Sequence, residues 1–460
     1  MSHNPATTGP AHPTRWRILG FLGIAQLILI LDVTVVAVAL PQMEADLGLS
    51  REALTWTVSA YTLTFGGLLL LGGRLVDLLG AKPVVLTGLT VFTVASLATG
   101  LAEVPAALVG GRIAQGLGAA LLSPAALSLV VTLFDGEERG RALGIWSALG
   151  GAGSAIGVLA GGLLTAGPGW PWVFYVNVPI GVITAIGLLT LLPSNLRPAT
   201  RPRLDILGAV LVTASSAALI YALINAGERG WLSTLTIWLA LAAAAGYVLF
   251  VVRQRASAAP LMDVRLLIRR PVATGVLHIT LATALMIAVF FLGTFYFQNT
   301  LGYGPLRTGL LFLPVAVATI VSANLAGRLI ASQGARRLGV TGLLLAAAGM
   351  AVPAFALGPV TAVVGVAVAA AGTGVMYVVA SATALGQVAP EEAGVASGIV
   401  STFHEFGASV GAAAISSIAA ASLVGGTLDG FQRGFGAAAA GALVAAVIAM
   451  IITPARRVPS

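Results

Sequence analysis

The segment Gly73-Arg74-Leu75-Val76-Asp77-Leu78-Leu79-Gly80-Ala81-Lys82 returns in a degraded form as Gly327-Arg328-Leu329-Ile330-Ala331-Ser332-Gln333-Gly334-Ala335-Arg336. The same offset of 254 residues relates Glu137-Glu138 to Glu391-Glu392, and Gly153-x-x-x-Gly157 to Gly407-x-x-x-Gly411. Three alignments at one spacing indicate a duplicated chain. Both copies of the first segment interrupt long apolar runs, so the repeated unit is a bundle of membrane helices. Internal repeats of this kind are typical of transporters.

The composition is that of a polytopic membrane protein. Hydrophobic residues make up 58% of the chain, charged residues 9%, and the mean hydropathy is +0.99. These values exclude an ordinary soluble domain. The apolar runs are continuous rather than alternating, which excludes membrane strands and predicts an all-α fold. We predict fourteen transmembrane helices, at about 17–41, 53–73, 82–102, 105–133, 140–166, 172–193, 206–226, 233–252, 272–297, 308–330, 338–357, 360–386, 394–423 and 433–453.

The basic residues predict the orientation of the chain. With a cytoplasmic N-terminus, nineteen Arg and Lys residues fall inside and four fall outside, namely Arg51, Arg229, Arg307 and Arg433. This bias places both termini in the cytoplasm. It also explains the net charge of +8 without nucleic acid. Residues 1–14 lack the apolar segment of a cleavable signal, and 23 arginines against one lysine hint at a bacterium of high GC content, so a bacterial inner membrane is expected.

The repeat also predicts the domain organisation. Residues 17–193 form an N-terminal six-helix bundle and residues 272–453 a C-terminal one, with cytoplasmic tails at 1–16 and 454–460. Residues 194–271 hold linkers and an inserted pair of helices, which we expect to be peripheral. The bridge Gln254–Pro271 mixes apolar residues with arginines, which predicts a partly helical segment on the cytoplasmic surface, a flexible linker being the alternative.

Five ionisable residues fall within predicted spans: Asp32, Arg112, His278, His404 and Glu405. Such residues are costly in a membrane and are usually functional. Asp32 lies roughly 20 Å from the inner surface at ~1.5 Å rise per residue. Its carboxylate must either pair with a cation or take a proton. A proton-coupled site and a structural partner of Arg112 are therefore both open readings.

The other four residues extend this interpretation. We expect Arg112 to face the bundle interior and to hold an acid or a backbone carbonyl. Glu405 is predicted to be a second proton or cation site. His404 and His278 are either proton relays or hydrogen-bonded interior histidines. The chain has no cysteine and four histidines, so neither a metal site nor a cofactor is expected.

Four aromatic residues are candidates for the wall of a substrate cavity. Tyr61, Trp146, Phe295 and Tyr377 fall within predicted spans and could offer ring faces to lipophilic cations. Aromatic residues on a membrane helix also serve ordinary packing, so this alternative stays open for each.

The motifs resemble those of the major facilitator superfamily, and more narrowly its fourteen-span drug:proton antiporter branch. Leu31-Asp32-Val33-Thr34-Val35-Val36-Ala37-Val38-Ala39-Leu40-Pro41 resembles the first-span motif of that branch, in which the acid is implicated in proton or substrate handling. Gly73, Asp77, Gly80 and Lys82 match the motif of the loop between spans 2 and 3, whose charges lock the cytoplasmic side. Leu78 and Ala81 stand where basic residues are common.

Three further stretches resemble the same branch. Gly144, Gly153, Gly157, Gly161 and Gly162 reproduce the spacing of the antiporter motif in the fifth span, with Val158 at the position of the usual proline. These glycines predict a smooth groove for another helix, or merely close packing. Trp170-x-Trp172-x-Phe174-x-x-Asn177-x-Pro179-x-Gly181 resembles the start of span 6. Glu405-Phe406-Gly407 resembles the acidic motif of span 13 in some exporters of cationic drugs.

The resemblance implies two six-helix bundles around a central cavity that opens alternately to either side. It implies export of lipophilic, often cationic, compounds from the cytoplasm in exchange for protons, by a monomer in contact with membrane lipids. A dedicated exporter of one endogenous metabolite, antibiotic, lipid or siderophore is the alternative. A membrane-embedded enzyme or a receptor is less favoured, because the chain lacks convergent catalytic groups and buried acids would serve no purpose in a receptor.

Overall fold

The computed structural model describes residues 14–134, 136–193, 205–258, 260–386, 393–420 and 428–453. Residues 1–13, 194–204 and 454–460, where the sequence predicts tails and a linker, lie outside this part. The described residues form helices and connecting turns without a strand. The first seven helices are α1 (Arg15–Leu47), α2 (Arg51–Leu79), α3 (Ala81–Gly100), α4 (Pro105–Leu133), α5 (Gly136–Ala166), α6 (Trp172–Tyr175) and α7 (Asn177–Leu191).

The insertion and the second half follow. The inserted hairpin consists of α8 (Ile206–Arg229) and α9 (Thr234–Ala256), and the 3-10 helix η1 (Val264–Ile268) comes after it. The second half consists of α10 (Arg270–Phe295), the π-helix η2 (Tyr296–Thr300), α11 (Pro305–Leu311), α12 (Leu313–Gln333), α13 (Ala335–Phe355), α14 (Pro359–Gly386), α15 (Ala393–Ile418) and α17 (Leu428–Ile452).

Twelve spans among the described residues are long and apolar enough to cross a membrane. The two other predicted runs, 140–166 and 394–423, overlap α5 and α15, which are 31 and 26 residues long, and residues 421–423 lie outside the described part. The structure therefore agrees with a multi-pass α-helical protein. The total of fourteen spans stays a prediction.

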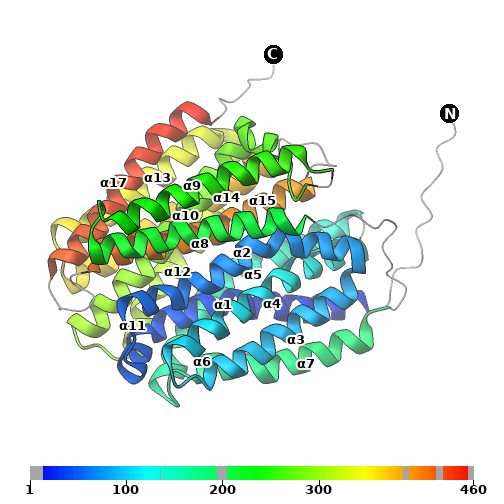
Figure 1. Cartoon of the computed structure of the whole chain (residues 1–460), viewed down its shortest axis with the longest axis horizontal. Coiled ribbons are helices and arrows are strands. Elements are labelled where there is room, and N and C mark those ends of the chain that lie inside the picture. Colours follow the sequence, from blue (N-terminus) through cyan, green and yellow to red (C-terminus); the bar gives the residue numbers. More distant parts are fainter. Residues whose placement is uncertain are drawn as a thin grey trace.

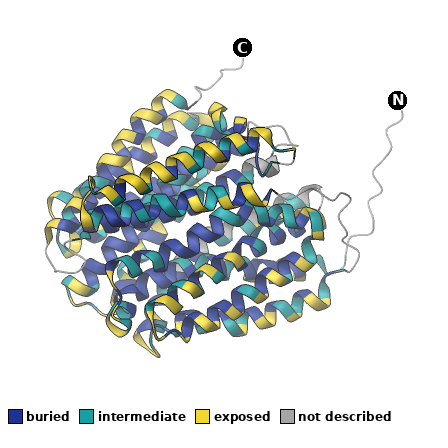
Figure 2. Cartoon of the chain, in the orientation of Figure 1, coloured by how far each residue is buried: buried dark blue, intermediate teal, exposed yellow. Residues whose placement is uncertain are grey.

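The helices lie side by side in one bundle (Figure 1). In the first half α1 packs on α5, and α3 packs on α4 and α7. In the second half α14 packs on α10, α12 and α13, and α13 also packs on α17. Exposed residues gather on the outward faces of peripheral helices such as α7, α9 and α17, and buried ones lie between the helices (Figure 2).

The two halves meet closely at the end of the bundle where α1 is followed by α2, which the predicted topology places outside and which we call the outer end. Residues 34–41 of α1 are buried on every side, and so are residues 287–297 of α10 and η2. Gln298 donates a hydrogen bond of 2.8 Å to the carbonyl oxygen of Val38, across the two halves. The outer end is therefore sealed in this conformation.

The inserted hairpin is only half peripheral. As expected, α9 lies at the periphery of the bundle, where it contacts α8 and η1. In contrast, α8 packs on both α2 and α15 and so contacts both halves. Arg51 fastens this junction at the outer end, because its guanidinium donates to the carbonyl oxygens of Ser416 on α15 and Ile224 on α8, each at 3.2 Å. The sequence predicted a solvent-side position for Arg51, but the side chain is buried.

Asp205 anchors the inner end of the hairpin. Its carboxylate accepts hydrogen bonds from the Gly208 N–H at 3.1 Å, from Arg253 at 3.0 Å and from Gln254 at 2.8 Å. Burial acts to raise the pKa of Asp205, but these three donors outweigh it, and the pKa lies below its usual value.

Gln254 links Asp205 to the bridge between α9 and α10. Its side-chain oxygen accepts from the Leu261 N–H at 2.7 Å, and Arg74 of α2 donates to the Pro260 carbonyl oxygen at 2.9 Å. The bridge contains η1, so the prediction of a partly helical segment is confirmed. Its buried residues Leu261, Met262, Val264 and Leu266 pack as one cluster with residues of α8, α9 and α15.

Candidate functional site

Asp32 and Arg112 form a buried ion pair between α1 and α4. Both residues are 1% exposed. The second carboxylate oxygen of Asp32 accepts a hydrogen bond of 3.0 Å from the side-chain amide of Gln115, whose oxygen in turn accepts from Arg112 at 3.0 Å. The acid, the base and the amide thus form a closed triangle, and the charge of Asp32 is fully compensated.

Arg112 holds the two kinds of partner that the sequence predicted. Besides Asp32, its Nε donates to the carbonyl oxygen of Thr57 on α2 at 2.9 Å. The guanidinium carbon lies 4.3 Å from the ring centroid of Tyr61, close enough for a cation–π interaction. The structure therefore brings three predicted site residues together, with α1, α2 and α4 converging on one cation.

Glu405 belongs to a second cluster on α15. His404 Nε2 lies 3.9 Å from its carboxylate, and the rings of His404 and Tyr377 are 5.9 Å apart. Among the described residues Glu405 forms no ion pair with Lys or Arg, although its side chain is only 11% exposed. A buried carboxylate without a permanent cation is costly unless a proton or a cationic ligand neutralises it.

Helix α2 separates the two clusters. Tyr61 faces Arg112, whereas Gly66 faces α15, and a Cβ atom at Gly66 would lie 2.6 Å from Cβ of Glu405. Five residues of helix correspond to roughly 7.5 Å of rise. The two clusters therefore lie at nearby heights on opposite sides of one helix.

Three predicted site residues lie apart from both clusters. The His278 ring is fully buried on α10, with Nδ1 2.8 Å from the Thr274 carbonyl oxygen, which is the arrangement of an interior histidine. Trp146 packs against the core of the first half. Phe295 is fully buried and packs on Phe291 at 5.0 Å between centroids. Their proposed roles in a relay or cavity stay predictions, and for Phe295 the contacts favour packing.

The loop motif contacts residues of the first half and of the bridge. Asp77 pairs with Arg74 at 3.8 Å, and Lys82 donates to the Leu192 carbonyl oxygen at 2.5 Å just beyond the end of α7. Gly80 joins α2 to α3 with φ of +91°, which favours glycine. A Cβ atom added at Gly73 would have no other atom within 4 Å. Among the described residues these four make no contact that locks the two halves together, and the lock stays a prediction.

Two helices pack against the glycines of α5. Built Cβ atoms at Gly153 and Gly161 would lie 2.7 Å from Ile30 and 3.0 Å from Val35, both on α1, and Gly157 faces Thr34 of the same helix. Gly162 instead faces Pro305 at 3.0 Å, and Gly309 faces the Val158 carbonyl at 2.9 Å, so α5 also contacts α11 of the other half. These contacts fit both a groove and mere close packing, so the groove stays a prediction. The surroundings of Gly144 lie outside the described part.

Sequence reasoning missed two residues of the Asp32 cluster. Gln115 links Asp32 to Ser96 on α3, to which it donates at 2.8 Å, and Asn177 at the start of α7 donates to Ser96 at 3.4 Å. Gln115 could have been found, because it lies three residues after Arg112 and shares its helix face. Ser96 carries no comparable signal. No group of three metal-ligating side chains occurs within the described ranges.

Two related helical halves around buried charged clusters define a polytopic membrane transporter rather than an enzyme. The chain belongs to the Major Facilitator Superfamily, whose family model matches residues 22–412. The resemblance drawn from its motifs is confirmed at the level of the superfamily. Its fourteen-span branch is not tested by this match.

The relatives include proteins named for drug resistance and antibiotic export. The chain is 36% identical to the "Puromycin resistance protein pur8" of Streptomyces alboniger, over 98% of this chain and 93% of that protein. It is 36% identical to the "Cephamycin export protein CmcT" of Amycolatopsis lactamdurans, over 94% and 90%. It is 34% identical to the "Multidrug resistance protein Stp" of Mycobacterium tuberculosis (strain CDC 1551 / Oshkosh), over 87% and 75%.

Solved structures share the fold at low sequence identity. A crystal structure of the peptide transporter POT in complex with sulfate has a TM-score of 0.67 and 16% identity, over 96% of this chain and 94% of that chain. The human organic anion transporter MFSD10 has a TM-score of 0.63 and 16% identity, over 95% and 100%. These likenesses concern the fold alone.

Proposed function

We propose that this protein exports small lipophilic, often cationic, compounds from the bacterial cytoplasm in exchange for protons. Relatives named for puromycin resistance, multidrug resistance and cephamycin export support efflux as the direction of transport. The site residues proposed for coupling are Asp32, Arg112 and Glu405. Alternating access would arise from rocking of two bundles, residues 17–193 and 272–453, against each other.

The observation that carries proton coupling is the sealed Asp32–Arg112–Gln115 triangle. A proton on Asp32 would cancel the ion pair and leave a net positive charge among α1, α2 and α4. Because charges in a low-dielectric interior interact strongly, this cluster cannot keep the same packing in both protonation states. Arg112 still holds Thr57, so α2 and α4 stay linked while α1 is released.

Glu405 is the proposed site for the positive charge of the substrate. It is buried beside His404 and Tyr377 and has no permanent cation among the described residues, so a lipophilic cation can supply the missing charge. Tyr377 would then offer its ring face to the same cation. Exchange follows if a proton and a cationic substrate neutralise the buried acids in turn.

The proposal includes a location and an assembly. The excess of Arg and Lys on one side supports a multi-pass protein of the bacterial inner membrane with both termini in the cytoplasm. We propose that the monomer is the functional unit, because each chain contains both halves and both charged clusters.

A dedicated exporter of a single endogenous product is the second candidate. It is favoured by relatives whose names refer to one antibiotic, such as cephamycin. Expression in a drug-sensitive bacterial host separates the two candidates. Resistance to many unrelated lipophilic cations supports the first, and resistance to one compound class supports the second.

The direct test uses purified protein in liposomes with an imposed pH gradient. We expect Asp32→Asn to abolish proton-driven uptake of a lipophilic cation, because the coupling acid is lost. Asp32→Glu, which keeps a titratable group, should retain part of the activity. Asp429→Asn, at an exposed acid at the start of α17, is the matched control and should transport normally.

Removing Asp32 leaves Arg112 buried without its acid, which costs about 3–5 kcal/mol and can disturb folding. Drug-stimulated proton release from detergent-solubilised, monodisperse protein is therefore measured in parallel. Undiminished proton release from folded Asp32→Asn protein would contradict the assignment.

A further inference from the structure

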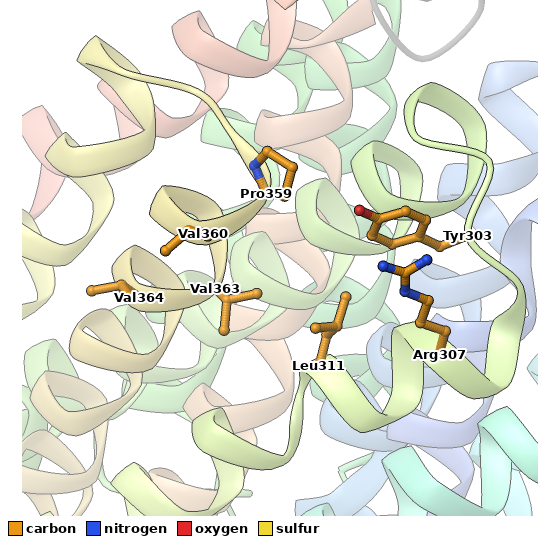
Figure 3. A pocket seen from close by; sticks show the side chains of 7 residues that line it. All are labelled: Tyr303, Arg307, Leu311, Pro359, Val360, Val363 and Val364. Carbon is orange, nitrogen blue, oxygen red and sulfur yellow. The ribbon is translucent and has the colours of Figure 1, made fainter.

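A groove at the outer end separates α11 from α14, on the perimeter of the second half (Figure 3). The volume of this groove is about 410 Å³. Tyr303 and Arg307 lie on the α11 side, where Leu311 continues the wall, and Val360, Val363 and Val364 form the α14 side. The groove thus has one cationic end and otherwise apolar walls.

The cation at this end is held in place by an aromatic stack. The guanidinium carbon of Arg307 lies 3.6 Å from the ring centroid of Tyr303. The Tyr303 ring stacks on Phe297, with centroids 6.4 Å apart and planes 10° apart, and the Tyr303 N–H donates to the Phe297 carbonyl oxygen at 2.9 Å. Phe297 is fully buried, so the stack rests on the core.

Arg307 does not compensate an acid within the part of the chain that the structure describes. The ion pairs between described residues do not include it, and its side chain is exposed. A guanidinium stacked on a ring keeps its N–H donors directed outwards, and its planar geometry suits phosphate oxygens. The groove therefore lacks an anion at its cationic end.

The α14 wall of the groove is exposed on the perimeter of the bundle. Val360 is 74% exposed and Val364 is 50% exposed, as expected for side chains on the lipid-facing surface of a membrane helix. A lipophilic cation would be repelled by Arg307, and a zwitterionic headgroup carries its own cation. We propose that this groove binds an anionic phospholipid, with its phosphate on Arg307 and an acyl chain against the valines of α14.

The site adjoins the contact that closes the outer end. Gly309, two residues after Arg307, faces the carbonyl of Val158 on α5 of the other half. A lipid in the groove therefore contacts a helix that belongs to the outer seal. This inference is independent of the proposed substrate and of proton coupling.

The test exploits the absence of cysteine from the chain. Val364→Cys is labelled with a fluorophore in the full-length protein, which is then reconstituted in nanodiscs containing spin-labelled phosphatidylglycerol or spin-labelled phosphatidylcholine. We expect phosphatidylglycerol to quench the fluorophore at about fivefold lower mole fraction, the ratio that attraction of an anionic headgroup by one arginine gives. Arg307→Gln should remove the difference.

Arg433→Gln, at another exposed arginine on α17, is the matched control and should keep the preference for phosphatidylglycerol. Equal quenching by the two lipids in the parent, or a preference that survives Arg307→Gln, would overturn the proposal. Stronger quenching by a spin-labelled lipophilic cation would assign the groove to a substrate and would also overturn it. Circular dichroism and monodisperse elution establish that each variant is folded.

Discussion

Besides the contact of α1 with α10 and η2 at the outer end, the two halves of this transporter meet along two lines that are built differently. The first, which we call the polar seam, joins α2 to α15 through Thr55, Thr62, Gly66, Ser409 and Ser416. Thr55 and Ser416 share a hydrogen bond of 2.6 Å, and Thr62 and Ser409 share one of 2.5 Å. Further inwards Gly66 faces Glu405, and Leu70 lies against Gly398. The polar seam is therefore closed from Thr55 to Leu70, and α8 covers it.

The second line, which we call the glycine seam, joins α5 to α11 through Val158, Gly162, Pro305 and Gly309. These contacts lie near the outer end of α5 and consist of close backbone approach. The hydrogen bonds found between described residues do not cross this seam. Separating α5 from α11 would therefore leave no buried polar group unpaired, whereas separating α2 from α15 would.

The difference suggests unequal roles in the transport cycle. Interfaces of small residues rely on shape and can part and close again, while buried hydroxyl pairs fix one register between helices. We expect the polar seam to act as the hinge and the glycine seam to act as part of the outer gate.

Gly66→Leu should have the largest effect, because it disrupts the polar seam. A Cβ at this position would lie 2.6 Å from Cβ of Glu405 and 3.2 Å from the Thr402 carbonyl oxygen, so there is no room for a side chain. We expect a loss of about 3 kcal/mol or more, the upper range for overpacking, together with loss of transport. Thermal unfolding in detergent measures the first effect.

Gly73→Leu is the control for stability, since it lies on the same helix and has no atom within 4 Å of a built Cβ. Equal unfolding temperatures for the two variants would mean that α2 and α15 separate without cost, which contradicts a hinge.

Gly162→Leu should open the glycine seam without unfolding the protein. Its Cβ would lie 3.0 Å from the Pro305 carbonyl oxygen, so a leucine must push α11 away from α5. We expect ~tenfold faster labelling of a Thr294→Cys reporter by a membrane-impermeant maleimide, because about 1.4 kcal/mol of overpacking shifts the population tenfold. Thr294 is fully buried at the sealed outer end.

Gly441→Leu on α17, which has open space around it, should leave the labelling rate unchanged. If Gly162→Leu also leaves the rate unchanged, α5 and α11 are not part of the outer gate.

Asp205→Asn should weaken the anchor of the hairpin that covers the polar seam. We expect a loss of about 1–3 kcal/mol at neutral pH, because three donors lose a charged acceptor. The pKa of Asp205 is lowered from 3.8, so its contribution is complete above that value and is lost as the pH falls through the lower folded-state pKa. Thermal unfolding measures this at pH 7 and pH 3. The difference in unfolding temperature between parent and variant should be smaller at pH 3.

Asp263→Asn, at an exposed acid that caps η1, should cost only a few tenths of a kcal/mol, like other weak surface contacts. If the unfolding temperatures of Asp205→Asn and the parent differ equally at both pH values, ionisation of this carboxylate contributes nothing to stability.

Much of the charged centre could be predicted from the sequence. A lone acid and a lone base in apolar spans have few ways to avoid the cost of burial, so Asp32 and Arg112 had to find polar partners. The glycine spacing on α5 likewise predicted a groove, because only small residues allow such close helix contact. The sequence named Arg112 as one possible partner of Asp32, and the structure shows this pair. The glycine pattern named no partner helix, and Gly162 faces α11 of the opposite half.

The position of α8 could not be predicted in this way. In a membrane the lipid-facing and protein-facing sides of a helix are both apolar. Hydropathy therefore does not distinguish a peripheral helix from one that packs against both halves. Arg51 gave no signal either, because a basic residue at a span edge ordinarily reaches water. Its burial follows from the carbonyl oxygens that α8 and α15 offer there.

The sequence by itself determined a duplicated, all-helical membrane protein with acidic residues within its apolar segments. The length of each apolar segment and the cost of burying a charge are local properties of the chain. Only the tertiary structure decided which helices close on which. That choice depends on the fit of glycines, hydroxyls and carbonyl oxygens from segments hundreds of residues apart, and such a fit leaves no periodic trace in any one segment.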